Sequence, residues 1–403
     1  MSGSHVRRRI RHVLPQPSLG TLPYDPPNQP MTGLAGAAWS LAAAQAAAGH
    51  DVEIVAPGTD GPQSRRVAGV QVSWLRTWPQ LRTAAIDLSQ LLPLALYTAR
   101  SARADIAHIH GNPYFRMDGM ARASILHVQD SSIHPGRKMA RSLASYDQVI
   151  CCSNYIRDEL LGRFSYLRGR THVLPNGVEW QPYAGTDRAS AREALGIDEA
   201  QVVLLFSGRL IPDKGLMVLL SALERLVRDA SSQPLLVVTG SAKMGLEGNP
   251  DAWTQADAYE RQVRQAAQDL PVRFVGATPR AQMPLLYRAA DIFVCPSTYQ
   301  EPLGMVNVEA QACGTPVIAS AVGGISDVVE HEVNGLLVPP GDVQALAGAL
   351  LRLIHDRSLR TRLGSAARES SARLDWRLLA ARLDEIYDRA LHGATQVHLQ
   401  AVG

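Results

Sequence analysis

The sequence predicts an α/β protein with two parallel sheets, each covered by helices on both faces. Short aliphatic runs alternate with helix-forming stretches along the whole chain, the pattern of parallel sheets. A turn-rich passage over residues 175–200 divides this alternation in two. The length of 403 residues agrees, because one hydrophobic core seldom supports so long a chain. We therefore expect two Rossmann-like domains.

The first half carries candidate strands in short runs rich in Val, Ile and Leu. They cover residues 10–14, 52–56, 106–110, 125–129 and 148–152. Helices are predicted over 33–48, 91–103 and 154–161. The first of these is mostly alanine broken by Ser40 and Gln45, so it is too weakly hydrophobic to span a bilayer.

The second half repeats the alternation. Its candidate strands cover residues 202–206, 235–239, 272–275, 292–296 and 316–319, and its candidate helices 215–228, 259–267, 282–289, 304–312 and 343–355. A last helix over 376–392 is amphipathic and needs a partner surface. Ligands of open α/β sheets bind at the carboxyl ends of strands, so two facing sheets predict a cleft that holds the chemistry.

The charge balance limits the partners. There are 40 Lys and Arg against 37 Asp and Glu, a net charge of +3, which is too small for nucleic-acid binding through phosphate neutralisation. Four cysteines without zinc-site spacing favour a reducing, cytoplasmic location. An arginine cluster near the start is followed by prolines instead of the apolar stretch of a secretory signal. We expect this cluster, Arg7, Arg8, Arg9 and Arg11, to be a solvated tail, with weak peripheral membrane contact as the alternative.

Two carboxylates, Glu301 and Glu309, are eight residues apart across a loop and the start of a helix. Both can face one crevice, and a carboxylate can accept hydrogen bonds from neighbouring hydroxyls of a sugar or ribose. Gly304 permits close approach of a ligand, and the N–H groups of residues 303–306 are available for phosphate or sugar oxygens. The alternative interpretation is a solvated loop glutamate and a helix-surface glutamate.

A second loop, over residues 207–215, follows an apolar strand and opens a helix. It holds Arg209 and Lys214 beside helix amides, which suits a departing diphosphate. The alternative is a Pro-Asp turn with two solvated cations. The chain contains no Gly-x-x-x-x-Gly-Lys-Ser/Thr loop, no Gly-x-Gly-x-x-Gly and no Asp-x-Asp. We therefore expect a site that needs neither metal nor cofactor and neutralises a diphosphate with positive side chains.

These motifs belong to longer runs. The densest is 291–317, followed by Gly323-Gly324 and 334–342; further matches are Gly208-Arg209 with Asp213-Lys214-Gly215, Leu174-Pro175-Asn176-Gly177-Val178 and Cys152-Ser153-Asn154. Together they resemble the retaining glycosyltransferases of family 4. The resemblance spans most of the chain and is densest in the second half.

The resemblance implies the GT-B architecture, with two Rossmann-like domains facing each other across a cleft. Residues 1–185 would bind the acceptor, 186–375 would hold the nucleotide-sugar donor, and 376–403 would form a helix crossing back to the first domain. It also implies that Arg209 and Lys214 bind the donor diphosphate, Glu309 the ribose and Glu301 the transferred sugar. The remaining implied donor contacts are Gly33, Gly208, Leu303, Gly304, Met305 and Val306. Thr32 departs from the family's usual Gly-Gly pair.

The family's active-site histidine has no exact counterpart. Alignment puts Gln129 at that position, while His127 lies two residues earlier on the same strand face. Either side chain remains a candidate for the role. His108 and His110 alternate along another strand; we expect His108 to be a buried structural residue and His110 to lie nearer the cleft, and we see no third ligand for a metal.

The leading hypothesis is a retaining hexosyltransferase that moves a sugar from a nucleotide diphosphate, by family frequency UDP, to an acceptor hydroxyl. The alternatives are a GT-B protein that binds a nucleotide sugar without transferring it, and a sugar-nucleotide epimerase. We expect His110, Asn112 and Tyr114 to help shape the acceptor pocket. A small metabolite, a growing glycan and a lipid-linked sugar all remain candidate acceptors.

Overall fold

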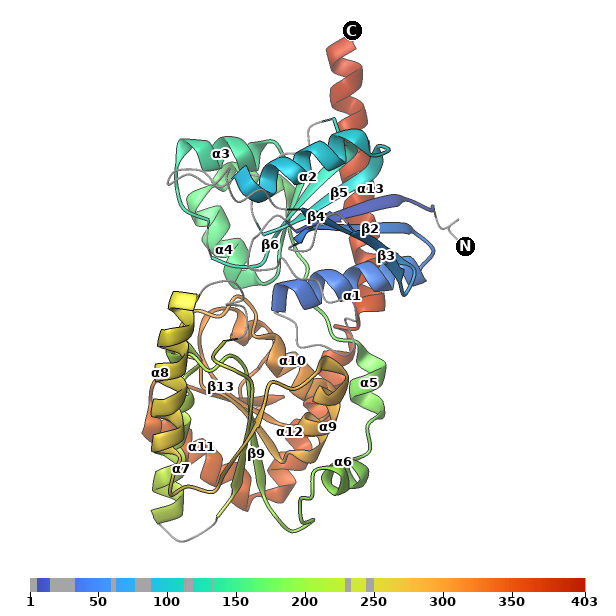
Figure 1. Ribbon diagram of the computed structural model, residues 1–403. Coiled ribbons are helices and arrows are strands. Elements are labelled where there is room, and N and C mark those ends of the chain that lie inside the picture. Colours follow the sequence, from blue (N-terminus) through green and yellow to red (C-terminus); the bar gives the residue numbers. More distant parts are fainter. Residues whose placement is uncertain are drawn as a thin grey trace. The chain divides into compact units, whose positions relative to one another are not determined.

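The computed structural model describes residues 6–14, 33–58, 63–76, 88–111, 113, 119–131, 133–228, 233–243 and 250–402. The chain forms two compact units (Figure 1). One unit contains the described residues up to Asn176 together with those from Trp376 onward, and the other is Gly177–Asp375. The boundary between the two units therefore lies between Asn176 and Gly177, ahead of the boundary predicted after residue 185. Each unit is built on a parallel sheet with helices, which confirms the predicted α/β class.

The first unit contains an eight-stranded sheet of described residues in the order β3-β4-β2-β1-β5-β6-β7-β8. Only the edge pair β3–β4 is antiparallel. The strands are β1 (Arg9–Val13), β2 (Asp51–Gly58), β3 (Gln63–Val67), β4 (Val70–Arg76), β5 (Ala104–His110), β6 (Ala121–Val128), β7 (Gln148–Cys151) and β8 (Thr171–Val173). The order places β1, β5 and β6 side by side at the centre.

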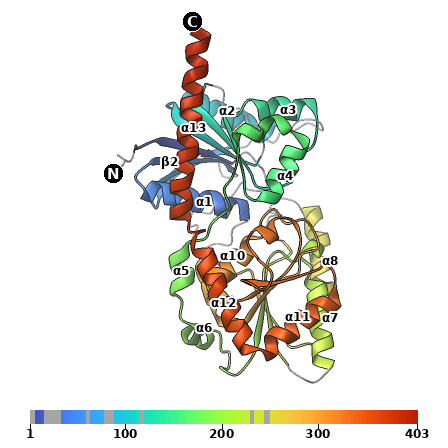
Figure 2. The same ribbon diagram turned by 180° about the vertical axis from the view of Figure 1, so that it is seen from behind.

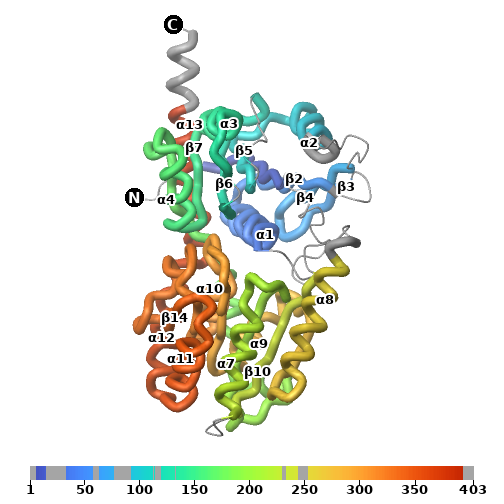
Figure 3. The backbone as a smooth tube through the Cα atoms, turned by 90° about the vertical axis from the view of Figure 1, so that its left-hand side faces the viewer, coloured from blue at the N-terminus to red at the C-terminus, as the bar shows by residue number. Residues whose placement is uncertain are grey.

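Helices cover both faces of this sheet. They are α1 (Gly33–Ala47), α2 (Leu88–Arg100), α3 (Arg137–Ala144), α4 (Asn154–Arg163) and α13 (Trp376–Val402). Figure 2 shows α13 running beside α1, and Figure 3 shows α2 and α3 across the sheet from α1. Leu379 and Leu383 of α13 are four residues apart and face the same way, so they pack with Leu41 of α1 on Ile10 and Ile106 of the sheet.

The start of the chain is not a solvated tail. Arg8 pairs with Asp384 at 2.9 Å and Asp388 at 2.6 Å on α13, and Arg11 pairs with Glu53 at 2.8 Å on β2. Arg8 and Arg11 are buried, because they flank or belong to a central strand. The prediction of a solvated arginine cluster is therefore wrong for these two, and their charges are already neutralised within the unit. Among the described helices, none has the length and hydrophobicity needed to cross a bilayer.

The second unit contains a six-stranded parallel sheet in the order β11-β10-β9-β12-β13-β14. The strands are β9 (Val203–Ser207), β10 (Leu235–Thr239), β11 (Val272–Gly276), β12 (Ile292–Cys295), β13 (Val317–Ser320) and β14 (Gly335–Val338). The helices are α5 (Trp180–Gly185), α6 (Arg188–Ala194), α7 (Leu216–Arg228), α8 (Pro250–Ala266), α9 (Met283–Ala289), α10 (Met305–Ala312), α11 (Val343–His355) and α12 (Arg357–Ala372).

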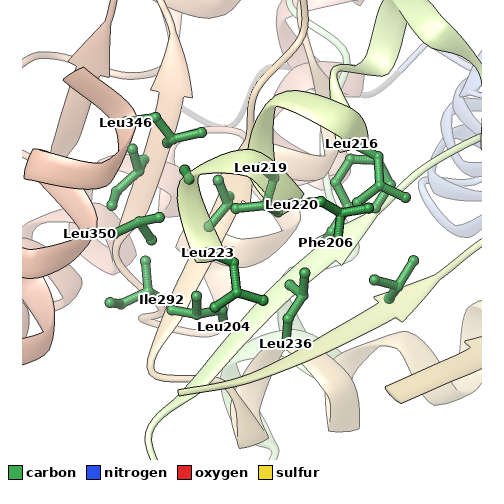
Figure 4. Packing of buried hydrophobic residues seen from close by; sticks show 14 of the residues in the cluster. Leu204, Phe206, Leu216, Leu219, Leu220, Leu223, Leu236, Ile292, Leu346 and Leu350 are labelled. Atoms are coloured by element: carbon green, nitrogen blue, oxygen red, sulfur yellow. The ribbon is translucent and has the colours of Figure 1, made fainter. Parts of the chain in front are cut away.

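The core of this unit forms where α7 and α11 meet the sheet. Leu216, Leu219, Leu220 and Leu223 recur at helical spacing and form the buried stripe of α7. Figure 4 shows these leucines directed at strand residues such as Leu204 and Leu236 and at Leu346 and Leu350 of α11. This packing fixes the start of α7, and with it the loop that follows β9.

The sequence missed several short elements, namely β3, β4, β8, β14, α3, α5, α6 and α12. The passage expected to be loose and turn-rich contains α5 and α6. Asp187 caps α6 by accepting a hydrogen bond from the Ser190 N–H at 2.9 Å. The buried Arg192 ties α6 to α9 by donating to the Ala289 carbonyl at 2.9 Å. Such helices are stabilised by tertiary contacts, which periodicity over one turn or two does not reveal.

Candidate functional site

Three loops of the second unit converge at the carboxyl ends of the adjacent strands β9, β12 and β13. Lys214 closes the short 3-10 helix η5 (Pro212–Lys214) after β9. Glu301 lies in the loop between β12 and α10, and Gly323 follows β13. The Gly324 N–H donates to the Glu301 carbonyl at 2.7 Å, and the Gly323 N–H to the Gln300 side chain at 2.6 Å. This is the edge of an open parallel sheet where ligands bind.

Gly215 lets the first two of these loops touch. Its φ is +70°, and a Cβ added there would lie 1.8 Å from the carbonyl oxygen of Pro296. The Thr298 N–H also donates to the Asp213 carbonyl at 2.8 Å. Only glycine fits this conformation and this close approach, so the residue fixes Lys214 against the loop that carries Glu301.

We expect Gly215→Ala to lower the free energy of unfolding by about 3 kcal/mol, because left-handed strain adds to a backbone clash. It should also weaken binding of the nucleotide diphosphate that the sequence leads us to expect, since the two loops must separate. Thermal unfolding and calorimetric titration measure these effects. Gly276→Ala is the matched control: φ is +74° there, but an added Cβ meets nothing within 4 Å. It should cost about 1 kcal/mol. Equal behaviour of the two variants would contradict the role assigned to Gly215.

Glu301 is buried, and both of its carboxylate oxygens accept hydrogen bonds. Its Oε1 accepts hydrogen bonds from Lys214 Nζ at 2.5 Å and from Ser297 Oγ at 2.7 Å, and its Oε2 accepts one from the Tyr299 hydroxyl at 2.6 Å. Lys214 Nζ also donates to the Tyr299 hydroxyl at 3.1 Å. The interpretation of Glu301 as a solvated loop residue is therefore wrong: its side chain is 6% exposed and that of Lys214 is 19% exposed.

The charges in this cluster depend on one another. Burial, the largest single effect, lowers the pKa of Lys214, but the charge and hydrogen bond of Glu301 together with Tyr299 and Cys295 outweigh it, so the pKa is raised. Burial, followed by the charge of Glu301, raises the pKa of Tyr299 to about 12. Lys214 is thus a permanent cation at neutral pH, and Tyr299 remains a neutral donor.

The N-terminus of α10 lies three residues beyond Glu301. Gly304, at φ +78°, precedes the helix without a side-chain cap, so the first N–H groups of α10, at Met305 and Val306, have no acceptor within the helix. Both polar atoms of the Asn307 amide are buried and lack a partner among the described residues. Leu303 is buried and packs beneath. Unsatisfied donors beside a lysine make this helix start suited to an anion.

The other described residues of this unit that were predicted to bind the sugar donor form no hydrogen bond or ion pair with Lys214 or Glu301. Glu309 Oε2 accepts a hydrogen bond from the Tyr287 hydroxyl at 2.7 Å. Burial raises the pKa of Glu309, and the Tyr287 hydrogen bond opposes the shift. Arg209 is exposed, and its guanidinium makes no hydrogen bond or ion pair with the part of the chain described. The Gly208 N–H donates to the Thr239 carbonyl at 3.1 Å.

In the first unit, Gly33 begins α1 as predicted, while Asn112 and Tyr114 lie outside the described residues. His110, His127 and Gln129 lie on the face of the sheet that α1 and α13 cover, and all are buried. Gln129 Nε2 donates to His110 Nδ1 at 3.0 Å. His108, predicted to be buried, is fully so, but so is His110.

The prediction that His108 and His110 lack a third possible metal ligand is wrong. His12 of β1 lies beside them, and one nitrogen from each ring falls within 4.8 Å of the others. The spacing along the sequence does not show this, because His12 reaches the pair by parallel pairing of β1 with β5. No other group of His, Cys, Asp or Glu within the described ranges is arranged in this way.

Sequence reasoning also missed the side chains that hold the predicted ones. Ser297 and Tyr299 precede Glu301 by four and two residues, so polar residues beside a loop glutamate were an available signal. Tyr287 lies on α9 and Asn307 on α10, and neither residue offered such a signal in the sequence. In the first unit, Gln45 interrupts an otherwise apolar helix face and Tyr387 continues the Leu379–Leu383 stripe of α13. A lone polar side chain at a core position was the available signal there.

Comparison with protein families gives two matches that between them cover most of the chain. The model described as Glycosyl transferases group 1 matches residues 187–370, and that described as Glycosyltransferase Family 4 matches residues 31–181. An uncharacterized glycosyltransferase of Methanocaldococcus jannaschii is 26% identical over 85% of this chain and 90% of its own length. A D-inositol 3-phosphate glycosyltransferase of Kribbella flavida is 35% identical over 58% of this chain, which spans 54% of that relative.

Solved structures share the fold over nearly the full length. Sucrose-phosphate synthase from Thermosynechococcus elongatus has a TM-score of 0.78 at 24% identity, covering 95% of this chain and 99% of its own. Anabaena HepE, solved in complex with UDP and glucose, has a TM-score of 0.70 at 22% identity, covering 94% of this chain and 99% of its own. These similarities confirm the two-domain architecture expected from the motifs.

Proposed function

Because the chain belongs to the group 1, family 4 glycosyltransferases and has the GT-B fold, we propose that it transfers a hexose from a nucleotide-diphosphate donor to an acceptor hydroxyl with retention of configuration. We propose UDP as the nucleotide; HepE, of the same fold, was solved with UDP-glucose. The four free, buried cysteines support a reducing, cytoplasmic setting for this reaction.

The observation that carries the proposal is the cluster of Lys214, Glu301 and the uncapped start of α10 at adjacent strand ends. A permanent cation and free N–H groups suit a diphosphate, and a carboxylate suits sugar hydroxyls. Glu301 lies within a few residues of the α10 N–H groups along the chain, and Lys214 contacts Glu301 directly. A solvated turn would supply neither the buried carboxylate nor the unsatisfied Asn307 amide.

In the proposed reaction, negative charge builds up on the diphosphate as the bond to the sugar breaks. Lys214 and the α10 N–H groups stabilise that charge, and the exposed Arg209 adds a second cation that has no ion-pair partner among the described residues. Glu301 holds the sugar while its hydrogen bonds from Ser297 and Tyr299 fix the carboxylate. Glu309, with one oxygen bound by Tyr287, keeps the other for the ribose.

The first test is a donor screen. The protein is incubated with UDP, GDP and ADP sugars, with and without sugar, sugar phosphate and lipid-linked acceptors, and nucleotide release is measured. Release that depends on an acceptor supports transfer, and the anomeric configuration of the product, read by NMR, tests retention. Binding without release would instead support the non-catalytic alternative, and a changed free sugar nucleotide would support the epimerase.

We expect transfer to continue in the presence of excess EDTA, since cations of the chain neutralise the diphosphate. The initial rate after dialysis against chelator should remain within about twofold of the untreated rate. Restoration of activity only by added Mg²⁺ or Mn²⁺ would contradict the metal-independent site. A chelator-treated metal-dependent glycosyltransferase serves as the control for complete removal.

A further inference from the structure

Four buried histidines of the first unit, His12, His108, His110 and His127, occupy two neighbouring rows at the carboxyl ends of β1, β5 and β6. Parallel pairing sets His12 opposite His108, and His110 opposite His127. Each is two or four residues after an isoleucine of the core, so all four share the face covered by α1 and α13. They are at most 1% exposed. Four imidazoles in one dry pocket require an account of where every ring nitrogen finds its partner.

The first half of that account starts at Asn176. Its Nδ2 donates to Gln129 Oε1 at 3.3 Å, and Gln129 Nε2 donates to His110 Nδ1 at 3.0 Å. His110 must therefore carry its proton on Nε2, and it donates that proton to His12 Nδ1 at 2.9 Å. The same rule then places the His12 proton on Nε2.

The second half continues without a break. His12 Nε2 donates to Gln45 Oε1 at 2.7 Å, and Gln45 Nε2 donates to the Tyr387 hydroxyl at 3.1 Å. The hydroxyl donates to His108 Nδ1 at 2.7 Å, and His108 Nε2 donates to His127 Nδ1 at 3.2 Å. The last proton, on His127 Nε2, is buried and has no acceptor among the described residues.

The direction of the chain is set by its amides. Gln45 on α1 and Gln129 after β6 belong to different elements, yet both present the oxygen and the nitrogen in the sense that runs from Asn176 to His127. Reversal would require both amides, and that of Asn176, to turn over together. A single direction therefore fixes all four histidines in the Nε2–H tautomer.

The same accounting excludes charge. Each link between two side chains holds one proton, so a second proton on any of the histidines would place two donors against each other. Burial acts in the same sense: it lowers the pKa of His12 to about 4 and that of His127 to about 3, and lowers the pKa values of His108 and His110 well below the usual range. The four histidines of this hydrogen-bond chain are therefore neutral throughout the physiological pH range.

The geometry of the rings disfavours a metal ion. His12 Nδ1 and His110 Nε2 are 2.9 Å apart, the distance of a hydrogen bond. The rings of His108 and His110 are stacked with 13° between their planes and 4.5 Å between centroids, so their in-plane lone pairs do not converge on one point. All of the ring nitrogens except His127 Nε2 instead take part in the hydrogen-bond chain.

We propose that this hydrogen-bond chain is a neutral positioning device for Gln129. It holds the amide in one orientation and leaves one hydrogen of Nε2 and one lone pair of Oε1 for a sugar hydroxyl at the strand end. The role of Gln129 in sugar transfer rests on the proposed function, but the direction and neutrality of the hydrogen-bond chain do not. Gln45 and Tyr387, which make no hydrogen bond with Gln129 and reach it only through the histidines, thereby become positioning residues.

The test uses the full-length protein with ¹⁵N-labelled histidine. In the wild type at pH 7, we expect the four buried histidines to be neutral Nε2–H tautomers by NMR. Tyr387→Phe removes the hydroxyl that accepts from Gln45, so the Gln45 amide can turn and His12 and His110 should populate both tautomers. Turnover should fall roughly tenfold with the affinity for UDP unchanged. Tyr146→Phe, another buried tyrosine of this unit with its hydroxyl 3.3 Å from the Pro113 carbonyl, should move neither readout.

Three results would overturn the proposal. The first is a cationic or Nδ1–H form of any of these histidines in the wild type. The second is a stoichiometric metal ion in the purified protein that is lost from His12→Ala, which would make the cluster a metal site. The third is a Tyr387→Phe protein whose His12 and His110 tautomers are unchanged. The wild-type spectrum decides the matter even if the variant fails to fold, and it does so whether or not the protein transfers a sugar.

Discussion

Replacing Lys214 with alanine should lower turnover by roughly a hundredfold or more, on the order of 3 kcal/mol in transition-state stabilisation. The lysine is held against Glu301, three residues before the uncapped start of α10, and the diphosphate gains negative charge as the sugar leaves. Lys214→Arg, which keeps the charge, should recover part of the loss. Steady-state kinetics with the donor identified by the screen measure both variants, and Arg209→Ala should behave similarly.

Stability must be separated from chemistry in this experiment. Without Lys214, the carboxylate of Glu301 remains buried without its cation, so the variant also loses stability. Lys243→Ala is the matched control, since Lys243 pairs with Asp257 at 2.9 Å on the exposed surface of the same unit. It should be nearly unchanged in both respects. Near-normal transfer by a folded Lys214→Ala protein would refute the assignment.

The first unit should lose roughly 5 kcal/mol of stability between pH 7.5 and pH 5.5. His12, His108, His110 and His127 stay neutral in the folded protein, because burial holds their pKa values well below the ordinary histidine value of about 6.5. The unfolded chain takes up protons at these residues below about pH 6.5, so protons favour unfolding. The stability they contribute is complete above that pH and is lost as the pH falls toward the folded values, about 4 for His12 and about 3 for His127. Each histidine costs about 1.4 kcal/mol over this interval.

Denaturant unfolding of the full chain at a series of pH values measures this loss. His127→Gln should remove about a quarter of the pH dependence, because one titrating group is gone. The control is His331→Gln: His331 lies in the second unit with a side chain 53% exposed, and its removal should leave the dependence intact. A flat stability between pH 7.5 and 5.5 would show that the histidines are not held neutral.

The parallel sheets could be predicted because buried strands such as β9 and β12 are short aliphatic runs, a pattern that sequence displays directly. Edge and short elements could not. β3 is mostly exposed and polar, and its place follows only from pairing with β4. α6 has a local cap at Asp187, but it depends on the buried Arg192, whose hydrogen bond to the Ala289 carbonyl is tertiary. Local patterning therefore specified the centre of each sheet but not its margins.

The candidate site divides in the same way. Lys214 and Glu301 were identified separately from loops at strand ends, and their 2.5 Å contact follows from the glycine that joins those loops. Tyr299 was missed because an aromatic residue in a loop has many uses. The histidine chain was missed altogether, since its members come from three strands and two helices and are joined only by pairing and packing. The residues of a site within one loop can be predicted from the sequence, whereas hydrogen-bond networks that cross the sheet cannot.

The placement of α13 has a consequence during synthesis. The residues up to Asn176 form a sheet whose core needs Leu379, Leu383 and Tyr387 of α13. Trp376, where α13 begins, is synthesised 200 residues after Asn176. At about 5–20 residues per second, the nascent chain waits on the order of 10–40 s with that aliphatic surface uncovered. During this interval the N-terminal sheet is a natural client for chaperones, and a premature stop codon near the end of the message would damage the earliest part of the protein to be made.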